Sequence, residues 1–501
     1  MLSKIDKKRG LSLQFYLLIC LASIGIFIVA YFFGYGLYST LLYNQQEQGR
    51  QKQDPSLRIP ERNALKVQEV TGGLASPTSM AFLDGNNLLV LEKNGQVRLI
   101  SNGILQKQPI LTLSVNTTAE RGLLGIATLR RYDGSSNSNN HHIDNPNAIK
   151  SDIDTSKKIV NKKATTTTTT KTISATTSNI THSEVFLYFT ESKPGEPLRN
   201  RVYRYDWDEQ KHLLFNPDLL LDLPAAPGPY HNGGKMVIGP DHYLYVVIGN
   251  LNTGDGLLQN NKHGKEPDDT SVILRIKPSD GSAAPKNPFI NDTNSAMRKY
   301  YAYGIRNSFG MTFDPITGSI WDTENGEATY DEINIVKPGF NSGWIQVMGP
   351  LSRNAGISTD QLVNYPISHY ANPRLHTGFA NPVFSWYAPV AVTDIEFMKS
   401  SVLGEKYRNN LFVGDYNYGN IYYFEVNSRR TGFKFNPITQ PGLSTDLVAD
   451  NGKEVSEVTF GTGFGGITDL GTGPADGFLY VLSINDDICG KGNGCTSGEK
   501  V

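Results

Sequence analysis

The residues best suited to chemistry lie at positions 231–234, where the sequence reads HNGG. His231 is a candidate proton acceptor, because an unperturbed imidazole has a pKa of about 6.5 and exchanges protons near neutral pH. Gly233 and Gly234 allow backbone conformations that other residues avoid, and they would let a flat ligand approach the main chain. The alternative is that His231 caps a turn which the glycines only shape. This stretch alone leaves both interpretations open.

A hairpin is expected directly after this motif and would position it. Residues 236–238 are apolar, a Gly-Pro-Asp turn follows, and residues 243–248 mix aromatic and β-branched side chains. His231 would then stand at the mouth of a strand.

The same hairpin pattern recurs along the chain. Copies lie at residues 80–91, 236–248, 311–321, 395–414 and 467–482. A further unit combines residues 122–127, 185–190 and 201–205, with its turn greatly expanded. Radial repetition of small sheets buries both faces of each sheet and leaves only short edges. The sequence therefore predicts an all-β fold, a six-bladed β-propeller over residues 64–488. A β-sandwich is the structural alternative.

Composition agrees with many short strands and tight turns. The chain has 49 Gly and 26 Pro, and its net charge of −1 indicates no nucleic-acid partner. Cys20 lies in an apolar run near the N-terminus, whereas the spacing of Cys489 and Cys495 would allow a small disulfide in an oxidising compartment. A metal site is less expected there, because no second pair of Cys or His lies nearby. Residues 489–501 are predicted to be a C-terminal tail.

The N-terminus predicts attachment to a membrane. Residues 1–10 are basic, and residues 11–43, which carry no charge, are predicted to be a transmembrane signal anchor. A cleaved signal peptide is the alternative, but no clear small-x-small cleavage site follows the run. The basic flank favours a cytoplasmic N-terminus, with a polar stalk at residues 44–63 outside. We expect a single-pass protein of the cell membrane whose large domain is extracytoplasmic.

The expanded turn at residues 132–183 is predicted to be a disordered, Thr-rich insertion, because it has too little apolar content to order itself. Its adjacent His141 and His142 are more typical of a solvated tract than of a metal site. Asn116, Asn179 and Asn291 lie in Asn-x-Thr sequons, which fits an extracellular location but is common by chance.

Several further motifs are shared with one family. They are ERGLLGIA at 120–127, HNGG at 231–234, VILRIKP at 272–278 with NPF at 287–289, YGIRNSFG at 303–310, ENGEATYDEIN at 324–334 and GFGGITDL at 463–470. In their order the chain resembles the soluble glucose/sorbosone dehydrogenases, also called aldose sugar dehydrogenases, over roughly residues 72–483. The resemblance implies a six-bladed propeller that binds pyrroloquinoline quinone (PQQ) and calcium. It also implies oxidation of an aldose at C1 to the lactone, with an unknown electron acceptor.

The resemblance also implies roles for individual residues. His231 matches the general base, which takes the proton of the anomeric hydroxyl while C1 gives a hydride to the quinone. The matching cofactor-binding positions are Glu120, Asn232, Arg306 and Asn307. A guanidinium suits the three carboxylates of PQQ, although Arg306 could instead form a salt bridge in the channel.

The metal positions lie in the ENGEATYDEIN motif. Gly326 and Glu327 match the backbone carbonyls that hold the calcium of the cofactor. Glu332, together with Asp331, matches a neighbouring structural calcium site, and acidic oxygens on a Gly-bearing loop suit this cation. The alternative for Asp331 and Glu332 is a solvated turn.

The chain departs from the family pattern at residues 415–420, which read DYNYGN where family members place basic residues. Glu327 also stands where the glucose enzyme has proline. The turn is closer to the propellers of hedgehog-interacting-type proteins, which act in binding. Two functions follow: a membrane-anchored quinoprotein, or a noncatalytic extracellular binding propeller, with a calcium-dependent lactonase as a distant third. His231, Arg306 and the calcium loop together favour the enzyme.

Overall fold

The computed structural model describes residues 65–132, 143–144, 180–254, 256–258, 260–261, 264–354, 379–484 and 499–500. The chain divides into residues 1–55 and 56–501, and every described residue belongs to the second unit. The predicted anchor, the stalk, His141, His142 and the two C-terminal cysteines lie outside the described residues. Within the described part, no helix has both the length and the apolar character needed to cross a membrane.

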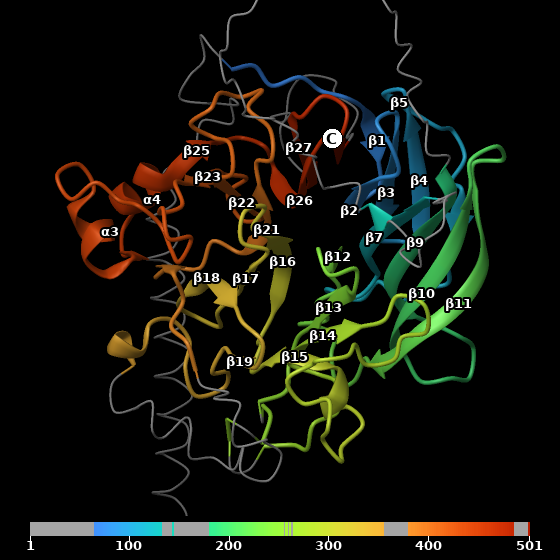
Figure 1. The fold of residues 1–501 in the computed structure, drawn as a ribbon, viewed down its shortest axis with the longest axis horizontal. Coiled ribbons are helices and arrows are strands. Elements are labelled where there is room, and N and C mark those ends of the chain that lie inside the picture. The colour runs from blue at the N-terminus through green and yellow to red at the C-terminus, as the bar shows by residue number, and fades with distance from the viewer. Residues whose placement is uncertain are drawn as a thin grey trace, which may run out of the picture. The chain divides into compact units, whose positions relative to one another are not determined.

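The described strands form six sheets around a central axis (Figure 1). The first sheet contains β2 (Pro77–Phe82), β3 (Asn87–Glu92), β4 (Gln96–Ser101), β5 (Ile104–Leu105) and β6 (Leu111–Thr112). The second contains β7 (Leu123–Tyr132), β8 (Ile143–Asp144), β9 (Ile180–Glu191), β10 (Arg199–Asp208) and β11 (Leu213–Pro224). The third contains β12 (Met236–Ile238), β13 (Leu244–Ile248), β14 (Val272–Ile276), β15 (Tyr300–Tyr303) and β19 (Phe340–Asn341).

The remaining three sheets complete the domain. The fourth contains β16 (Ser308–Phe313), β17 (Ile320–Glu324), β18 (Asp331–Val336), β20 (Phe384–Trp386) and β24 (Val448–Ala449). The fifth contains β21 (Val392–Phe397), β22 (Leu411–Asp415), β23 (Ile421–Phe424) and β25 (Thr459–Gly461). The sixth contains β26 (Gly466–Thr472), β27 (Leu479–Ile484), β28 (Glu499–Lys500) and β1 (Gly72–Leu74). Short helices α3 (Pro441–Asp446) and α4 (Gly452–Val458) lie beside β24 of the fourth sheet, and α4 also contacts β23 of the fifth.

The first strands of the sheets close a ring. β2, β7, β12, β16, β21 and β26 contact one another in this order, and β26 contacts β2. The sixth sheet combines strands from the beginning and the end of the described residues, because β1 pairs with β28. The protein is therefore an all-β β-propeller. The hairpins that recur in the sequence are the first two strands of the sheets, as in β12 with β13 and β16 with β17.

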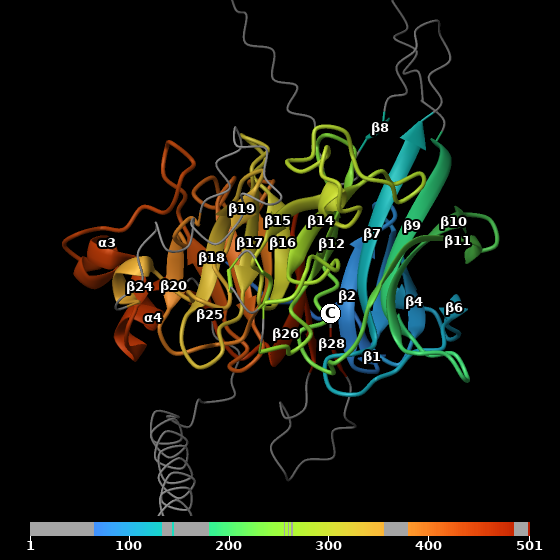
Figure 2. The same ribbon diagram turned by 90° about the horizontal axis from the view of Figure 1, so that it is seen from below.

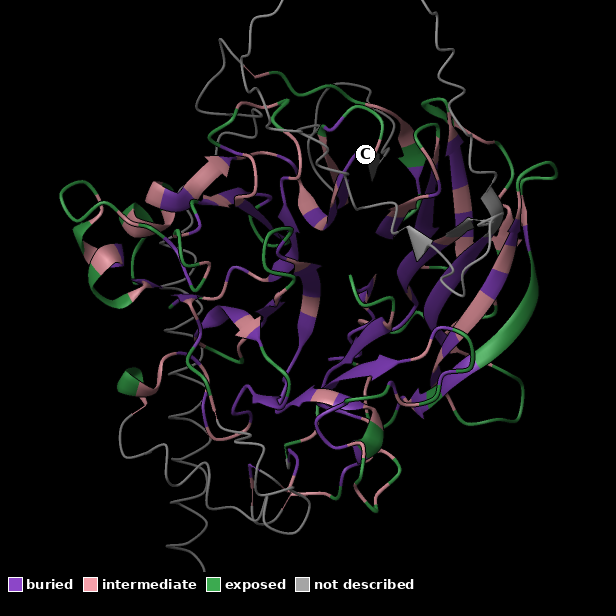
Figure 3. Cartoon of the chain, viewed as in Figure 1, coloured by how far each residue is buried: buried purple, intermediate pink, exposed green. Residues whose placement is uncertain are grey.

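The cores lie between neighbouring sheets. The described residues form six hydrophobic clusters, and each cluster joins two adjacent sheets. In the cluster between the second and third sheets, for example, Phe186 lies with Met236 and Leu244. Both faces of a sheet are thus buried, which explains why β13 and β14 have no exposed residue (Figure 3). Strands buried on both faces appear in the sequence as nearly continuous apolar runs.

The strand directions place the functional loops on one face. The second strand of each sheet runs antiparallel to the first. Figure 2 shows the sheets from the side. The loop before each first strand and the turn between the second and third strands therefore lie on the same face, which we call the site face.

The predicted insertion joins the second sheet. β7 extends to Tyr132, β9 begins at Ile180, and these strands pair with each other, so both ends of the segment predicted at 132–183 are strand. Within it, β8 pairs with the end of β7. The rest of the insertion lies outside the described residues.

Candidate active site

His231 lies on the site face, in the loop that leads from β11 into β12. Its backbone is left-handed (φ 60°), and its side chain is buried. A non-glycine residue in this conformation is strained and persists only where its surroundings hold it. Here the backbone N–H of His231 donates to Glu120 Oε2 over 2.6 Å. Glu120 precedes β7, so this contact ties the second and third sheets together at the site.

The two glycines after His231 have a packing role. A Cβ atom on Gly233 would lie 2.7 Å from the carbonyl oxygen of Val247, and one on Gly234 would lie 2.8 Å from the Leu124 side chain. The glycines thus allow close approach of neighbouring strands. The interpretation that they make room for a flat ligand is not supported at these two positions.

The partners of Asn250 fix the tautomer of His231. Asn250 Nδ2 donates to the carbonyl of Thr253 over 3.0 Å, and Asn250 Oδ1 accepts from the N–H of Asn252 over 3.1 Å. The amide oxygen therefore faces the imidazole, and His231 Nδ1 carries a hydrogen that it donates to Asn250 Oδ1 over 2.5 Å. His231 Nε2 is left with its lone pair, which is the form that a general base requires.

Arg306 and Asn307 stand beside this histidine, in the loop before β16. Asn307 Nδ2 donates to Glu120 Oε2 over 3.4 Å, so the same carboxylate contacts both loops. The N–H of Arg306 donates to Glu324 Oε1 over 2.6 Å, and the guanidinium lies 5.2 Å from the centre of the Trp344 ring. The structure thus brings together His231, Glu120, Arg306 and Asn307 from three parts of the chain.

Burial and charge set the protonation states of the site. Burial, assisted by the positive charge of Arg306, lowers the pKa of His231 to about 4. Burial also raises the pKa of Glu120, although hydrogen bonds from His231 and Asn307 oppose the shift. His231 is therefore neutral, and able to accept a proton, over a wider acidic range than a free histidine.

Asn232 is directed into the protein. Asn232 Nδ2 donates to the Pro229 carbonyl over 2.7 Å, and Asn232 Oδ1 accepts from Asn200 Nδ2 over 3.1 Å. Its backbone carbonyl accepts from the Tyr188 hydroxyl over 2.8 Å. Both ends of the amide are used within the fold, so the side chain that we expected to bind cofactor instead holds the His231 loop on the second sheet.

The predicted metal positions separate into two groups. Gly326 lies in the turn between β17 and β18, next to the exposed Glu327, and its carbonyl accepts from Arg306 Nη1 over 2.9 Å. Calcium at the carbonyls of Gly326 and Glu327 would require Arg306 to give up this contact. Among the described residues, no group of three or more His, Cys, Asp or Glu side chains is arranged to hold a metal ion.

Asp331 and Glu332 do not meet. They are neighbours on β18, and successive side chains of a strand point to opposite faces. Asp331 accepts from the N–H groups of Gly326, Val390 and Ala391. Glu332 accepts from the N–H of Gly349 and from Asn334 Nδ2. The two carboxylates therefore cannot hold one ion together.

Asp415 does not place a negative charge in the site. It is fully buried and accepts from the N–H groups of Tyr418 and Gly419 and from the hydroxyl of Tyr422. Burial raises its pKa to about 7. The turn instead exposes Tyr416 and Tyr418, which are 45% and 40% exposed.

Three buried polar atoms at the site have no hydrogen-bond partner among the described residues. They are Arg306 Nε, Asn307 Oδ1 and the indole Nε1 of Trp344. A buried donor on a cation, next to an unused acceptor, fits an anionic group that also carries a hydrogen-bond donor. PQQ, with its three carboxylates, meets this requirement. Arg306 and Asn307 are therefore the residues that would hold it.

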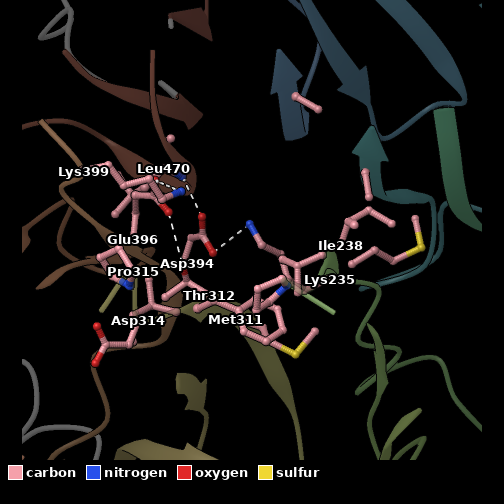
Figure 4. A pocket seen from close by; sticks show the side chains of 18 of the residues that line it. Lys235, Ile238, Met311, Thr312, Asp314, Pro315, Asp394, Glu396, Lys399 and Leu470 are labelled. Carbon is pink, nitrogen blue, oxygen red and sulfur yellow. Dashed lines mark hydrogen bonds and ion pairs between the residues drawn. The ribbon is translucent and has the colours of Figure 1, made fainter. Parts of the chain in front are cut away.

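One cavity lies away from this site. It has a volume of about 820 Å³ and opens at the ends of the first strands, opposite the site face (Figure 4). Lys235, which lines the cavity, pairs with Asp394 over 2.8 Å and with Asp469 over 2.7 Å. Because these aspartates belong to the fifth and sixth sheets and Lys235 leads into the third, the ion pairs cross the axis. The cavity contains none of the predicted site residues.

Three residues of the site were missed in the sequence. They are Asn250, Glu324 and Trp344, which contact the side chain of His231, the backbone of Arg306 and the guanidinium of Arg306, respectively. Asn250 lies two residues after the second strand of the predicted hairpin, and Glu324 is the first residue of the ENGEATYDEIN motif, so the position of each in the sequence was a usable signal. Trp344 had none, since its loop carries no recognisable pattern.

Comparison with known proteins points to one family. The family model described as Glucose / Sorbosone dehydrogenase matches residues 141–487. An uncharacterised protein of Synechocystis is 24% identical over 447 residues, covering 85% of this chain and 86% of the relative. Aldose sugar dehydrogenase YliI of Escherichia coli is 29% identical over 262 residues, which span 52% of this chain and 59% of that enzyme.

A solved structure has the same fold. The PQQ-bound form of aldose sugar dehydrogenase from Streptomyces coelicolor superposes with a TM-score of 0.53 at 22% identity, over 89% of this chain and 96% of the other. At this level of identity the likeness concerns the fold.

Proposed function

Because this chain belongs to the glucose/sorbosone dehydrogenase family, we propose that it oxidises an aldose sugar at C1 to the lactone, with PQQ as cofactor. The observation that carries the proposal is the environment of His231, whose tautomer leaves Nε2 free beside a buried arginine with an unused donor. The proposal is also supported by a relative that is an aldose sugar dehydrogenase.

In the proposed reaction His231 Nε2 accepts the proton of the anomeric hydroxyl. The two electrons leave C1 as a hydride, and the C1–O bond becomes the carbonyl of the lactone. PQQ, when bound, supplies the acceptor for that hydride. Asn250 holds the hydrogen on Nδ1 throughout, so that Nε2 presents its lone pair until it accepts that proton. Arg306 and Asn307 would bind the cofactor through the atoms that have no partner.

We extend the proposal to calcium and to the architecture. Calcium would bind at the backbone carbonyls of Gly326 and Glu327 after Arg306 releases the Gly326 oxygen, with Glu332 at a separate structural ion. The six sheets would be the six blades of the propeller. Residues 11–43 would anchor the protein in the cell membrane, with the propeller outside the cytoplasm. Protease added to intact cells should then release a soluble domain, and complete protection would contradict this topology.

Reconstitution tests the chemistry. Purified protein is loaded with PQQ and calcium, and dye reduction is followed with several aldoses. His231→Ala should retain the fold and bind PQQ but lower sugar oxidation by roughly 10²–10⁴-fold, the usual share of a positioned general base. If His231→Ala with PQQ bound oxidises sugar at the wild-type rate, His231 is not the general base and only shapes the turn. If the wild-type protein binds no PQQ in the presence of calcium, the noncatalytic binding propeller takes the place of the enzyme.

A further inference from the structure

The cavity opposite the site face has the size of a small-molecule site. Its volume is about 820 Å³, and sites for small organic ligands typically measure about 300–1,000 Å³. All six first strands contribute residues to its wall. Because it contains no residue that we assign to sugar or cofactor, the chemistry of this wall must be considered by itself.

Apolar side chains from three sheets line the cavity. They are Phe82 of β2, Val237 of β12 and Phe313 of β16, and all three are only partly buried. The Phe82 ring meets the Tyr480 ring edge to face with centres 5.0 Å apart, and the Phe313 ring meets the Tyr245 ring in the same way at 5.2 Å. Neighbouring rings therefore hold both phenylalanines in place. These side chains offer a surface to the apolar body of a ligand.

The fifth sheet supplies most of the charged lining. Asp394 and Glu396 lie on β21, and Lys399 and Arg408 lie in the connection from β21 to β22. Figure 4 shows Asp394, Glu396 and Lys399 close together on one side of the cavity. The cavity thus combines apolar contacts from other sheets with charged groups from this one.

The two carboxylates of β21 are already engaged. Glu396 accepts from the N–H and the hydroxyl of Thr472, and its third donor is Lys399 over 3.2 Å. Asp394 accepts from a backbone N–H and pairs with Lys235 over 2.8 Å. An organic cation could bind these carboxylates only by displacing donors of the fold.

The remaining carboxylate of the wall is Asp314, and it is also satisfied. It accepts from Nε and Nη2 of Arg430, over 2.8 and 2.7 Å, a bidentate contact of the strong kind. All three carboxylates that line the cavity therefore have charged donors already. The wall is not suited to a cationic ligand.

The cations of the wall, in contrast, have donors to spare. Among the described residues, the guanidinium of Arg408 has no hydrogen-bond partner, and its ion pair with the exposed Glu405 spans 3.8 Å. Lys399 donates to Glu396 and so uses one of its three ammonium hydrogens. Both cations line the cavity and are partly exposed. The unused capacity of the wall is thus that of a binding site for an anion.

We infer that this cavity binds an amphipathic organic anion, a molecule with an apolar body and one carboxylate. The apolar body would lie against the side chains from the first, third and fourth sheets. The carboxylate would accept from Arg408 and Lys399, and charge-assisted hydrogen bonds to a guanidinium are among the strongest in proteins. The inference goes beyond the proposed function and requires neither PQQ nor sugar.

The test compares three probes of nearly the same shape. They are 2-naphthoate, 2-naphthylmethanol and 2-naphthylmethylammonium, titrated by calorimetry against the full chain in lipid nanodiscs, with empty nanodiscs subtracted. We expect naphthoate to bind about tenfold more tightly than the alcohol, since a hydrogen bond to a charged group contributes at least this much. The ammonium probe should bind most weakly. Arg408→Gln should remove the advantage of naphthoate and leave the affinity for the alcohol unchanged. Arg429→Gln is the matched control, because Arg429 is exposed and does not line the cavity.

Methyl NMR places the probe without any change to the binding residues. Met80 and Met311 line the cavity, so their ¹³C-labelled methyl signals should shift with naphthoate, and Met80→Leu and Met311→Leu assign them. Arg306→Gln, on the site face, should leave naphthoate binding unchanged. If naphthoate does not bind, binds no better than the alcohol, or loses its binding in Arg306→Gln and not in Arg408→Gln, the inference is wrong. Failure of the protein to oxidise sugar would leave it standing.

Discussion

Replacing Asn250 by aspartate tests the geometry of the site most directly. The side chain of Asn250 accepts from His231 Nδ1 over 2.5 Å, so Asn250→Asp would place a carboxylate oxygen at nearly the same point. Its negative charge would stabilise the imidazolium. An opposite charge this close usually shifts a pKa by about 1–3 units. The pKa of His231, which burial and Arg306 lower to about 4, should therefore rise to roughly 5–7 in the variant.

The sign of the effect on activity follows from the proton balance. Only neutral imidazole accepts a proton, so activity is lost as pH falls through the pKa of His231. With a pKa of about 4, roughly nine tenths of the wild-type molecules would be active at pH ~5. If the pKa of His231 is near 6 in Asn250→Asp, only about one tenth of the variant molecules would be active at the same pH of ~5. The acidic limb of kcat/KM should thus move towards neutral pH.

Two measurements check this shift. NMR titration of the His231 Cε1–H reports the pKa without cofactor or substrate, and the pH dependence of kcat/KM reports it in the holoenzyme. Asn252→Asp is the control, because Asn252 is exposed and contacts Asn250 only through its backbone N–H. Equal pKa values for His231 in the wild type and in Asn250→Asp would refute the assigned contact and its tautomer.

Three other predictions follow from the same contacts. Arg306→Ala should weaken PQQ binding before it alters turnover of the loaded enzyme, and spectral titration with PQQ would show this; unchanged affinity would exclude a cofactor contact. Asp415 has a pKa raised to about 7, so its contribution to stability is present below the unfolded pKa of about 4 and is lost as pH rises through 7. Thermal melts should therefore show a loss between pH ~4 and ~7 that is smaller in Asp415→Asn, and equal losses would contradict the burial of the charge. Replacing residues 133–179 by a short Gly-Ser linker should change the melting temperature by less than about 5 °C, because loop closure depends weakly on length; a larger fall would mean that the insertion packs.

The sequence was most informative about strands. Residues 236–248 and 311–321 were recognisable as hairpins because strands buried on both faces must be apolar and their turns need Gly, Asp or Pro. It was less informative about side-chain direction. Asn232 is adjacent to His231 but faces inward, and Asp331 and Glu332 face opposite ways. Direction depends on turn conformation and strand register, which residue types alone do not specify.

The assembly of the site depended on contacts between distant segments. Glu120 and His231 are 111 residues apart, and Glu120 and Asn307 are 187 residues apart, yet one carboxylate contacts both. Family motifs indicated these three residues. The hydrogen bond from His231 to Asn250 required the structure, because it depends on how the turn after β13 approaches the loop before β12.

The ion pairs of Lys235 have an electrostatic consequence. They cross the axis between the site face and the cavity on the opposite face, and Lys235 has only 14% of its side chain exposed. Removing the Lys235 ammonium would therefore leave the buried carboxylates of Asp394 and Asp469 beside each other without the cation that separates their charges.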